Sequence, residues 1–502
     1  MTVRSGTPSL AEPAPGPRVA VVGAGAVGLT LAGRLAQHGV GVAIFDQAAE
    51  PERVGSKAIC MQRETLEIWA RLGVGDRVAE RGVQWEVGRT YRGGHELFSL
   101  ELPTQDAHFP PFVNISQSEV EDLLEAQVSA LGVRVRRGHR CVGVEQDDTG
   151  VTLSIETDAG RTGERFDFVI GADGAHSAVR HGARIGFEGY TFDDRFLIAD
   201  VRADLPFANE RHFHFDPPWN PGRQVLIHPQ PDGVWRIDWQ VPSETDADAE
   251  RASGALDRRI RAVIGERTPY ELVWLTAYRF SQRVADRFRD GRIFLAGDAA
   301  HVMSPFGARG LNSGVADAEN LAWRLAWVLR HRVDPSLLDA YEVERRGAAL
   351  ENLAATDATM RFMAPHGVAR RAWRDLVLRM APRVAWFRRR VNAGRLAEPA
   401  RYAAAGPDER GRPPHGSVAP DVALPSGGRL RARLGTGFVL LAPRPVQASV
   451  PVEVVPPSSV YGPDRAWLVR PDGYLVDSVG LGDLDGVWIT SRIGAGLVDN
   501  PG

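Results

Sequence analysis

Three glycines near the N-terminus have the spacing that binds the phosphates of a dinucleotide. Gly23, Gly25 and Gly28 fit G-x-G-x-x-G and follow the apolar run Val19 to Val22, which predicts a buried strand. In this pattern the first glycine permits a tight turn, the second lets a pyrophosphate approach the backbone, and the third lets helix and strand pack closely. The N-terminus of the following helix attracts the anion. The chemistry indicated is therefore the binding of a dinucleotide cofactor.

The segments around these glycines occur in the order that a βαβ unit requires. Residues from Ala26 to about His38 predict a helix, and Val40 to Phe45 predict a second strand. Asp46 ends that strand eighteen residues after Gly28, close to the roughly 20 residues expected before a ribose-binding carboxylate. The order favours a Rossmann-like domain over a purely structural glycine turn.

Two later segments show which dinucleotide to expect. Residues 166–180 predict a strand that enters a turn at Asp173 and then a short helix. Residues 291–312 predict a strand that ends near Asp298 and leads into a glycine-punctuated loop, followed by a long amphipathic helix over about 313–330. Each segment by itself is weak evidence for a particular cofactor, but their occurrence together and in this order is specific.

Together the three segments, spread over roughly the first 345 residues, resemble the class A flavoprotein aromatic hydroxylases of the para-hydroxybenzoate hydroxylase fold. The resemblance implies an α/β fold, with a Rossmann-like FAD-binding domain and an inserted mixed β-sheet substrate domain. It also implies FAD as cofactor, NADPH or NADH as co-substrate without a domain of its own, O2, and a small aromatic substrate. Reduced FAD would form a C4a-hydroperoxide that hydroxylates a phenolic or polyketide-type ring.

Two alternatives stay open from the sequence. One is a Baeyer–Villiger or epoxidising monooxygenase of the same fold, and the other is a non-catalytic flavin-binding protein. We assign no catalytic residue, because the cofactor carries the chemistry in such enzymes. No Ser-His-Asp arrangement or metal-ligand spacing stands out, and we expect no metal.

The resemblance also implies cofactor contacts outside the glycine motif. Asp298 is expected to hydrogen-bond the ribityl chain or ribose, and Gln117 to meet the flavin. Lys57 stands where relatives usually carry an arginine against the pyrophosphate, and lysine lacks the bidentate fork. Asp173 is expected to shape its turn and support both cofactors. Arg63 is a further cofactor candidate, and Arg180 a candidate for a pyridine-nucleotide phosphate.

The loop before the long helix completes the expected cofactor site. Ala308 and Arg309 stand where many family members have Gly-Gln. The loop still leads into a helix, so its amides can face the pyrimidine edge of the flavin and stabilise negative charge there. The residues expected to contribute are Pro305, Gly310, Leu311 and Asn312.

Short alternating strands between Tyr190 and Arg283 predict one wall of a substrate pocket. His214, His228 and Trp239 lie on these strands and are candidates to contact the substrate. Core or sheet-face positions are the default for such residues.

Five regions are expected along the chain. They are 1–17, a disordered tail; 18–189, the first part of the FAD-binding domain, with strands at about 83–110 contributing to the substrate domain; 190–284, the substrate-binding sheet; 285–400, completion of the FAD-binding domain with long helices; and 401–502, a linker and a small thioredoxin-like α/β domain. The last region resembles the tail of larger aromatic hydroxylases in the segments starting at Val418, Phe438 and Ala466. It contains no cysteine, so a structural role is expected, in packing on the flavin domain or supporting a homodimer.

Composition narrows the function classes. The 502 residues carry a net charge of −3, which gives no field for nucleic acid. Cys60 and Cys141 are the two cysteines, too few for a disulfide framework or a zinc cluster. No apolar run is long enough for a membrane span, and residues 1–17 lack the apolar core of a signal peptide. A cytoplasmic enzyme is expected.

Overall fold

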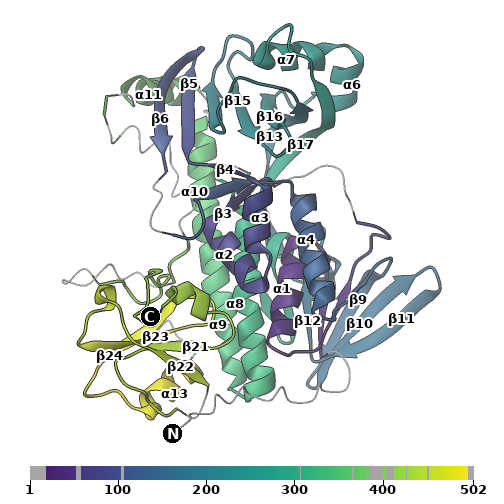
Figure 1. Cartoon of the computed structure of the whole chain (residues 1–502). Coiled ribbons are helices and arrows are strands. Elements are labelled where there is room, and N and C mark those ends of the chain that lie inside the picture. The colour runs from purple at the N-terminus through teal and green to yellow at the C-terminus, as the bar shows by residue number, and fades with distance from the viewer. Residues whose placement is uncertain are drawn as a thin grey trace.

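The computed structural model shows an α/β protein with several sheets around a long central helix, α8 (Gly310–His331) (Figure 1). One sheet contains the nucleotide motif, a larger sheet lies above it in Figure 1, and a third sheet is C-terminal. The structure describes residues 18–51, 58–102, 107–305, 307–363, 367–381, 383–384, 386, 399–402, 412–425, 427–448 and 451–495.

The nucleotide sheet has the predicted βαβ start. β1 (Val19–Val22) and β2 (Val42–Phe45) pair in parallel and are joined by α1 (Ala26–Gln37). The six strands are ordered β18-β19-β12-β1-β2-β8. The remaining strands are β8 (Val135–Arg136), β12 (Phe168–Gly171), β18 (Arg289–Asp290) and β19 (Ile293–Leu295).

The parallel pairing of β1, β12 and β19 brings the three sequence signatures together. β12 pairs in parallel with both β1 and β19. The carboxyl ends of parallel strands meet at one edge of a sheet, where ligands bind in open α/β sheets. The glycine turn, the turn at Asp173 and the turn at Asp298 therefore lie at the same edge.

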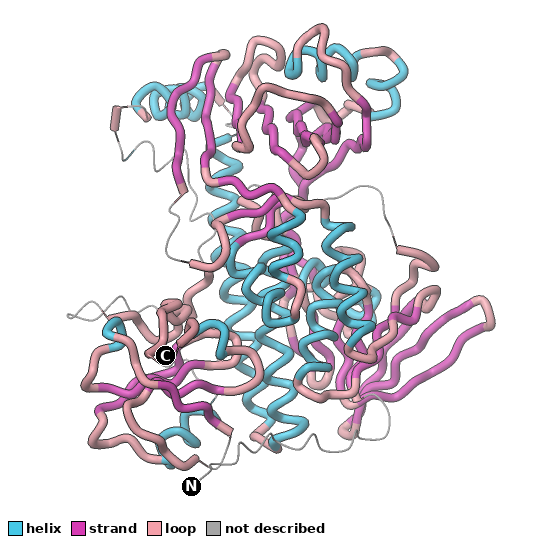
Figure 2. Tube along the Cα trace, in the orientation of Figure 1, coloured by secondary structure: helices cyan, strands magenta, loops and turns pink. Residues whose placement is uncertain are grey.

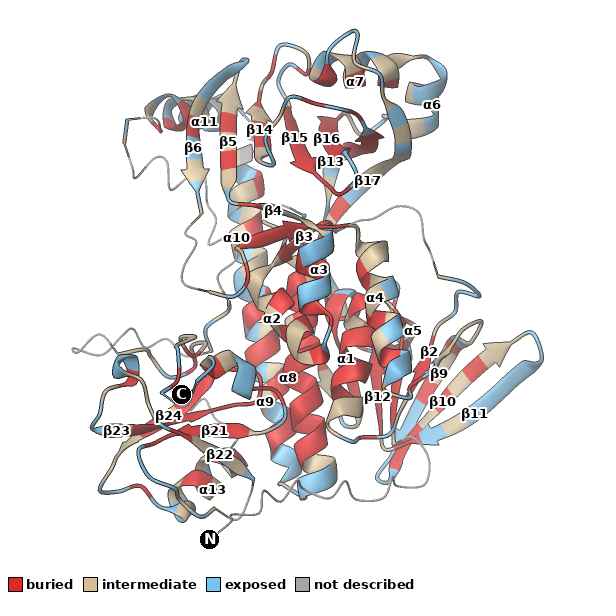
Figure 3. Cartoon of the chain, viewed as in Figure 1, coloured by how far each residue is buried: buried red, intermediate tan, exposed pale blue. Residues whose placement is uncertain are grey.

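Helices pack around α1 and α8. α1 contacts α8 and α4 (Gln117–Ala130), and α2 (Arg63–Leu72) packs against α8. Every residue of α8 from Asn312 to Trp327 except Ala316 is buried (Figure 3). The amphipathic pattern predicted here is thus not matched by an exposed face over most of the helix. The other α-helices outside the large sheet are α3 (Gly75–Arg81), α5 (Ala178–Gly182), α9 (Asp339–Tyr341), α10 (Gly347–Met363) and α11 (Val368–Met380).

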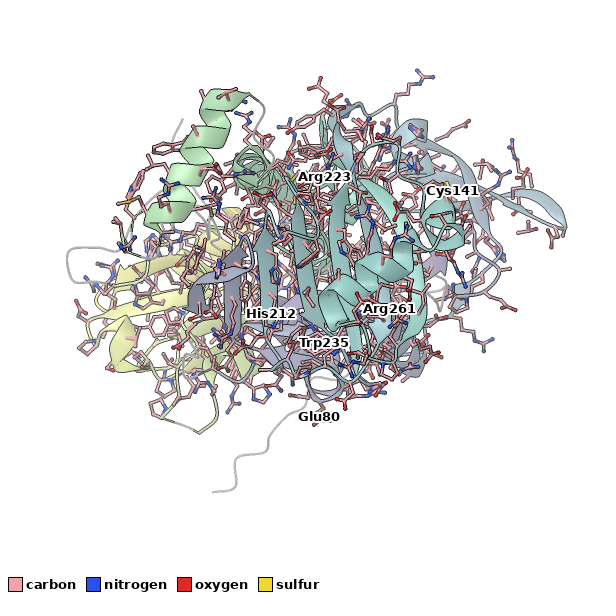
Figure 4. The ribbon with its side chains drawn as sticks, turned by 90° about the horizontal axis from the view of Figure 1, so that it is seen from above. Glu80, Cys141, His212, Arg223, Trp235 and Arg261 are labelled. Carbon is pink, nitrogen blue, oxygen red and sulfur yellow. The ribbon has the colours of Figure 1, made fainter. Side chains whose placement is uncertain are left out.

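The large sheet has eight strands in the order β20-β17-β13-β16-β15-β14-β5-β6. Two of its residues, His212 and Trp235, are labelled in the view from above (Figure 4). They are β5 (Val87–Arg92), β6 (His95–Glu101), β13 (Phe187–Arg202), β14 (Arg211–Phe215), β15 (Gln224–Pro229), β16 (Val234–Val241), β17 (Glu271–Ala285) and β20 (His301–Val302). Of the strands predicted at about 83–110, β5 and β6 belong to this sheet, whereas the strand Val83–Trp85 pairs in a separate one. Bulky apolar residues on one face form a core with α7 (Ala255–Ile264), beside α6 (Ala247–Ala252).

Two three-stranded sheets connect these units. β7 (Phe112–Asn114) lies between β3 (Cys60–Gln62) and β4 (Val83–Trp85). The second sheet, β11-β10-β9, projects from the nucleotide sheet at the lower right of Figure 1 and consists of β9 (Arg140–Asp147), β10 (Gly150–Thr157) and β11 (Gly160–Phe166).

The C-terminal sheet packs against the far half of α8 (Figure 2). Its order is β22-β21-β23-β24, with one parallel pair, β21 and β22, and antiparallel pairs elsewhere. Trp323 and Trp327 of α8 place their rings edge-on against Phe438. The elements are β21 (Phe438–Leu441), β22 (Val452–Val455), β23 (Arg465–Val469), β24 (Leu475–Gly480) and α13 (Gly486–Ala495).

Among the described residues, no helix combines the length and apolar character that crossing a membrane requires.

Candidate functional site

A cavity of about 430 Å³ extends from the glycine turn to the large sheet. One end is formed by Gly25, Ala26 and the first residues of α8, and the other by side chains of β13 to β17. The aromatic residues in its lining are Trp85, Phe112, Phe196, Phe213, Trp274, Tyr278 and Phe280. The cavity thus joins the edge that carries the three signatures to an aromatic wall.

The three glycines have distinct steric surroundings. A Cβ at Gly23 (φ +104°) would lie 2.3 Å from the carbonyl oxygen of Ala172, and one at Gly28 would lie 2.0 Å from that of Gly23. A Cβ at Gly25 would meet nothing closer than Glu121 Oε1 at 3.5 Å. Gly23 and Gly28 are therefore required by packing, whereas Gly25 faces the cavity. This open backbone at a helix N-terminus fits a pyrophosphate.

Two carboxylates hold the amides of the glycine turn. Asp46 Oδ2 accepts a hydrogen bond from Ala24 N at 2.7 Å, so its position at the end of β2 is as predicted. Glu121 Oε1 accepts from Ala26 N at 3.1 Å and from Gln117 Nε2 at 2.8 Å. Gln117 is the first residue of α4 and lines the cavity. Sequence reasoning missed Glu121, although its i+4 spacing from Gln117 places both on one helix face.

The turn acids play different parts. Asp173 accepts hydrogen bonds from Ser177 Oγ and from the amides of Ala178 and Val179 at 2.7 and 3.2 Å, and so shapes its turn as expected. Burial raises the pKa of Asp173, against the opposing effect of these hydrogen bonds. Asp298 is exposed on a short 3-10 helix and lines the cavity.

The two further arginine candidates are bound to backbone oxygens. Arg180 is buried, and its guanidinium donates to Ala299 O at 2.9 Å and Ala175 O at 2.8 Å. Arg63 Nε donates to Phe109 O at 2.8 Å. Neither lines the cavity. Lys57, the expected pyrophosphate contact, lies outside the described residues.

All four expected residues line the cavity: Pro305 in the loop before α8, and Gly310, Leu311 and Asn312 in the first turn of α8. The Asn312 side chain donates to Cys60 O at 2.9 Å and Ala308 O at 2.6 Å, and accepts from Gln62 N at 2.9 Å. It therefore fixes the loop to β3. Ala308 has φ +52°, in the left-handed region that glycine adopts more easily. The loop thus keeps a glycine-type turn at the position where it departs from the common family sequence.

Of the three substrate candidates, only His228 lines the cavity. Trp239 is packed in the core on the opposite face of the sheet, and His214 stacks on Tyr91 with ring centroids 4.4 Å apart. The reason is strand alternation: successive side chains point to opposite faces. Trp239 and His214 occupy strand positions whose side chains point away from the cavity, and residue type alone does not show this.

The same alternation identifies polar residues that sequence reasoning missed. On β16, Arg236 and Asp238 face the cavity, while Trp235, Ile237 and Trp239 face the core. In the sequence, the alternation of these two charged residues with bulky apolar ones could have indicated that they lie on the face opposite the core. Arg211 of β14 lines the same cavity.

Of the three charged residues that line the cavity on these strands, only Arg236 has an ion-pair partner among the described residues. Arg236 makes a bidentate ion pair with Asp200, with both N–O distances 2.8 Å. Arg211 Nε and Asp238 Oδ1 are buried and have no hydrogen-bond partner. Burial raises the pKa of Asp238 to about 7, although Arg236 opposes this. Burial also lowers the pKa of His228 to about 3, so that it is neutral at pH 7.

Within the described ranges, no three His, Cys, Asp or Glu side chains are placed to hold a metal ion. Burial raises the pKa of the Cys60 thiol to about 12, so this cavity residue is not a thiolate nucleophile at neutral pH.

Known proteins are similar to this chain over most of its length. A family profile described as an FAD binding domain matches residues 17–356. The chain is 34% identical over 352 residues to the rifampicin monooxygenase of Streptomyces venezuelae, across 69% of this chain and 71% of that protein. It is 32% identical over 392 residues to a 3-(3-hydroxy-phenyl)propionate/3-hydroxycinnamic acid hydroxylase of Mycobacterium sp. strain KMS, across 76% of this chain and 66% of that one.

Among solved structures, the OxyS anhydrotetracycline hydroxylase from Streptomyces rimosus aligns with a TM-score of 0.76 and 28% identity. That alignment covers 95% of this chain and 99% of the other. The range 17–356 contains the glycine turn, both later strand–turn segments and the large sheet.

Proposed function

This chain belongs to the FAD-dependent aromatic hydroxylase family of monooxygenases, and we propose that it hydroxylates a phenolic or polyketide-type ring with NADPH or NADH and O2. The observation that carries the proposal is the course of the cavity. It begins at the open backbone of Gly25, passes the loop before α8, and ends on the aromatic wall of the large sheet. A flavin held at one end would face an aromatic substrate at the other.

The residues present fit FAD. Gly25 and Gly310 offer backbone that no side chain covers within 3.4 Å of an added Cβ, and the helix N-termini beside them favour anionic groups. We propose that Gly25, Gln117, Asp298 and the loop of Pro305 and Gly310 to Asn312 hold the cofactor. Asp46 would contact the ribose. When bound, reduced FAD supplies the activation of O2.

The protein's own part is to position the ring and keep water out. Phe196, Phe213, Trp274 and Phe280 give the substrate end apolar surface, which favours a flat aromatic compound over water. No thiolate, metal or acyl-transfer group is needed for this role. The polar residues among them then determine orientation.

One experiment tests the assignment. Purified holoprotein is given NADPH or NADH with a panel of phenols and aromatic polyketides under ¹⁸O2. We expect substrate to accelerate NAD(P)H oxidation, and a hydroxylated product to contain one atom of ¹⁸O. Label arising only from water would contradict the proposal, and so would NAD(P)H oxidation that no compound in the panel accelerates.

We also propose that the C-terminal region is a thioredoxin-like unit with a structural role. The order β22-β21-β23-β24, one parallel and two antiparallel pairs followed by α13, supports this. The described residues between β21 and β22 contain no helix, which is a departure from the complete fold. The absence of cysteine from 401–502 leaves no thiol chemistry for it.

A further inference from the structure

The cavity face of the large sheet carries a regular arrangement of side chains. His212 pairs with Ile227, and Ile227 with Ile237, which fixes the register of β14, β15 and β16. Each of these three residues has a chain neighbour that faces the cavity, and the three neighbours form one row: Arg211, His228 and Arg236. The next row on the same face is Phe213, Leu226 and Asp238, since Leu226 pairs with both of the others.

Arg211 provides a cation without a protein anion. Its Nε is buried and has no hydrogen-bond partner, and its guanidinium lies 5.7 Å from the centroid of the Trp85 ring. Within the part of the chain that the structure describes, no carboxylate forms an ion pair with it. Arg211 is half-buried, and a guanidinium whose Nε is buried without a hydrogen-bond partner is costly, so this position is explained best by a ligand that supplies the negative charge.

Asp238 provides an acceptor without a protein donor. Its Oδ1 is buried and has no hydrogen-bond partner. The nearby cation on its own strand, Arg236, is already engaged by Asp200 through two hydrogen bonds. Asp238 lines the cavity and has one carboxylate oxygen without a protein donor, to which a ligand hydroxyl could donate.

The two groups are well separated. Arg211 is on β14 and Asp238 on β16, two strand spacings apart and in neighbouring rows, so their backbones are roughly 12 Å from each other on the sheet. Between and around them the lining is apolar or neutral, with Phe213, Leu226 and neutral His228. A fused ring system with one substituent at each end matches this separation better than a single small ring does.

We propose that Arg211 and Asp238 are the two specificity-determining anchors of the cavity. Arg211 binds a carboxylate or other anionic substituent of the substrate, and Asp238 accepts a hydrogen bond from a hydroxyl at the opposite end of a fused aromatic ring. This inference rests on the proposed function and narrows its substrate class to acidic, hydroxylated polycyclic compounds.

Binding of matched naphthalenes to the holoprotein tests it, with the dissociation constant measured by isothermal titration calorimetry. The probe is 6-hydroxy-2-naphthoic acid. 2-Naphthol lacks the acid, and 6-methoxy-2-naphthoic acid lacks the hydroxyl donor. We expect the probe to bind more tightly than either control, and Arg211→Gln to weaken it roughly 10- to 100-fold, the range for lost charge-assisted hydrogen bonds. Binding of 2-naphthol should stay within about threefold.

Asp238→Asn should reduce the preference for the hydroxy over the methoxy acid without removing the preference for the acid over 2-naphthol. Arg202→Gln is the matched control, because Arg202 is exposed on the same sheet and pairs with Glu271. It should change none of these constants. If Arg211→Gln does not fold, Arg211→Lys keeps the charge and should retain the preference for the acid.

Equal wild-type affinity for the probe and 2-naphthol, or no binding of the acid, would overturn the inference. So would an Arg211→Gln variant that weakens the acid and 2-naphthol alike. The proposed function is decided separately by ¹⁸O incorporation. If the protein prefers the hydroxy acid but forms no oxygenated product, the proposed function is rejected and the roles of Arg211 and Asp238 are retained. If it forms an oxygenated product without this preference, the proposed function is retained and the roles of Arg211 and Asp238 are rejected.

Discussion

Two groups of arginines are withdrawn from solvent in this molecule, and their charges are balanced differently. Beneath the C-terminal sheet, Arg470 Nη1 lies 2.6 Å from Glu344 Oε1, and Arg470 Nε donates to Asp472 Oδ1 at 2.9 Å. Arg324 Nη2 lies 2.9 Å from Glu344 Oε2. Burial opposes ionisation of Glu344, but Arg324 and Arg470 outweigh it and hold the pKa of Glu344 below its ordinary value.

In the cavity the balance is incomplete. Arg236 has Asp200, but Arg211 has no carboxylate partner among the described residues, and Asp238 has no donor for Oδ1. In the first group every arginine has a carboxylate partner within the protein, and the group joins the C-terminal sheet to α8. The second leaves one cationic and one anionic position open toward a cavity. Charge compensation, more than burial, therefore distinguishes a structural cluster from a binding surface in this protein.

Breaking the balanced group should have the largest effect. Arg470→Met leaves Glu344 and Asp472 short of a cation, and removing one member of a buried ion pair costs about 3–5 kcal/mol. We expect a loss of this size in the free energy of unfolding, measured by urea denaturation. Arg202→Gln breaks an exposed pair and should cost at most about 1 kcal/mol. Similar losses in both variants would remove the distinction drawn above.

The glycine turn likewise contains one position that packing requires, Gly28, and one that is open to a ligand, Gly25. Gly25→Val adds a side chain where an added Cβ meets nothing closer than 3.5 Å, so the protein should fold but bind FAD on the order of 100-fold less tightly. Gly28→Ala places Cβ against Gly23 O and should destabilise the fold itself. Fluorescence titration with FAD and thermal unfolding separate the two outcomes. A folded Gly25→Val protein that retains FAD fully would contradict the cofactor position.

Asp238 should make stability depend on pH. Its pKa in the folded protein is about 7, above the ordinary value of about 3.9. The folded state then binds the proton more tightly between about pH 4 and pH 7, so the free energy of unfolding falls as pH rises through this window. Asp238→Asn should flatten that fall. Urea denaturation at pH 5, 6, 7 and 8 measures it, and parallel curves for wild type and variant would count against the raised pKa.

The smallest effect is expected for Arg211 in the absence of ligand. Burial lowers the pKa of Arg211, which means that the cavity disfavours its charge. Arg211→Gln should therefore leave the free energy of unfolding within about 1 kcal/mol of wild type, or raise it. A loss as large as that of Arg470→Met would show that Arg211 has a structural partner after all. Thermal unfolding of the two variants side by side provides the measurement.

Local sequence was sufficient wherever a function depends on consecutive residues. The turn at Gly23, the packing of Gly28 and the acid at the end of β2 are all where G-x-G-x-x-G and its spacing predict them. The loop from Pro305 to Asn312 lines the cavity as expected. The physical reason is that turn geometry and helix N-termini are set by neighbouring residues, so a short motif carries them.

The substrate face could be predicted only as strands. Residue type selected His214 and Trp239, but the sheet turns both away from the cavity and presents Arg211 and Asp238 instead. Parity within one strand is visible in a sequence. Which face becomes the cavity depends on which elements cover the other one, and here α7 covers it.

What the sequence by itself determined is the βαβ nucleotide unit, because it depends on local spacing, and, through the resemblance of three ordered segments to a known family, the family and its cofactor. What only the tertiary structure decided is which charged residues are buried and with which residues they pair. Asp317, Glu319 and Arg324 are charged residues within the helix that the sequence predicted as amphipathic, yet all three are buried. Each has an oppositely charged partner from a distant part of the chain, such as Arg345, Arg34 and Glu344. Pairing across such separations follows from packing and has no signature in the spacing of neighbouring residues.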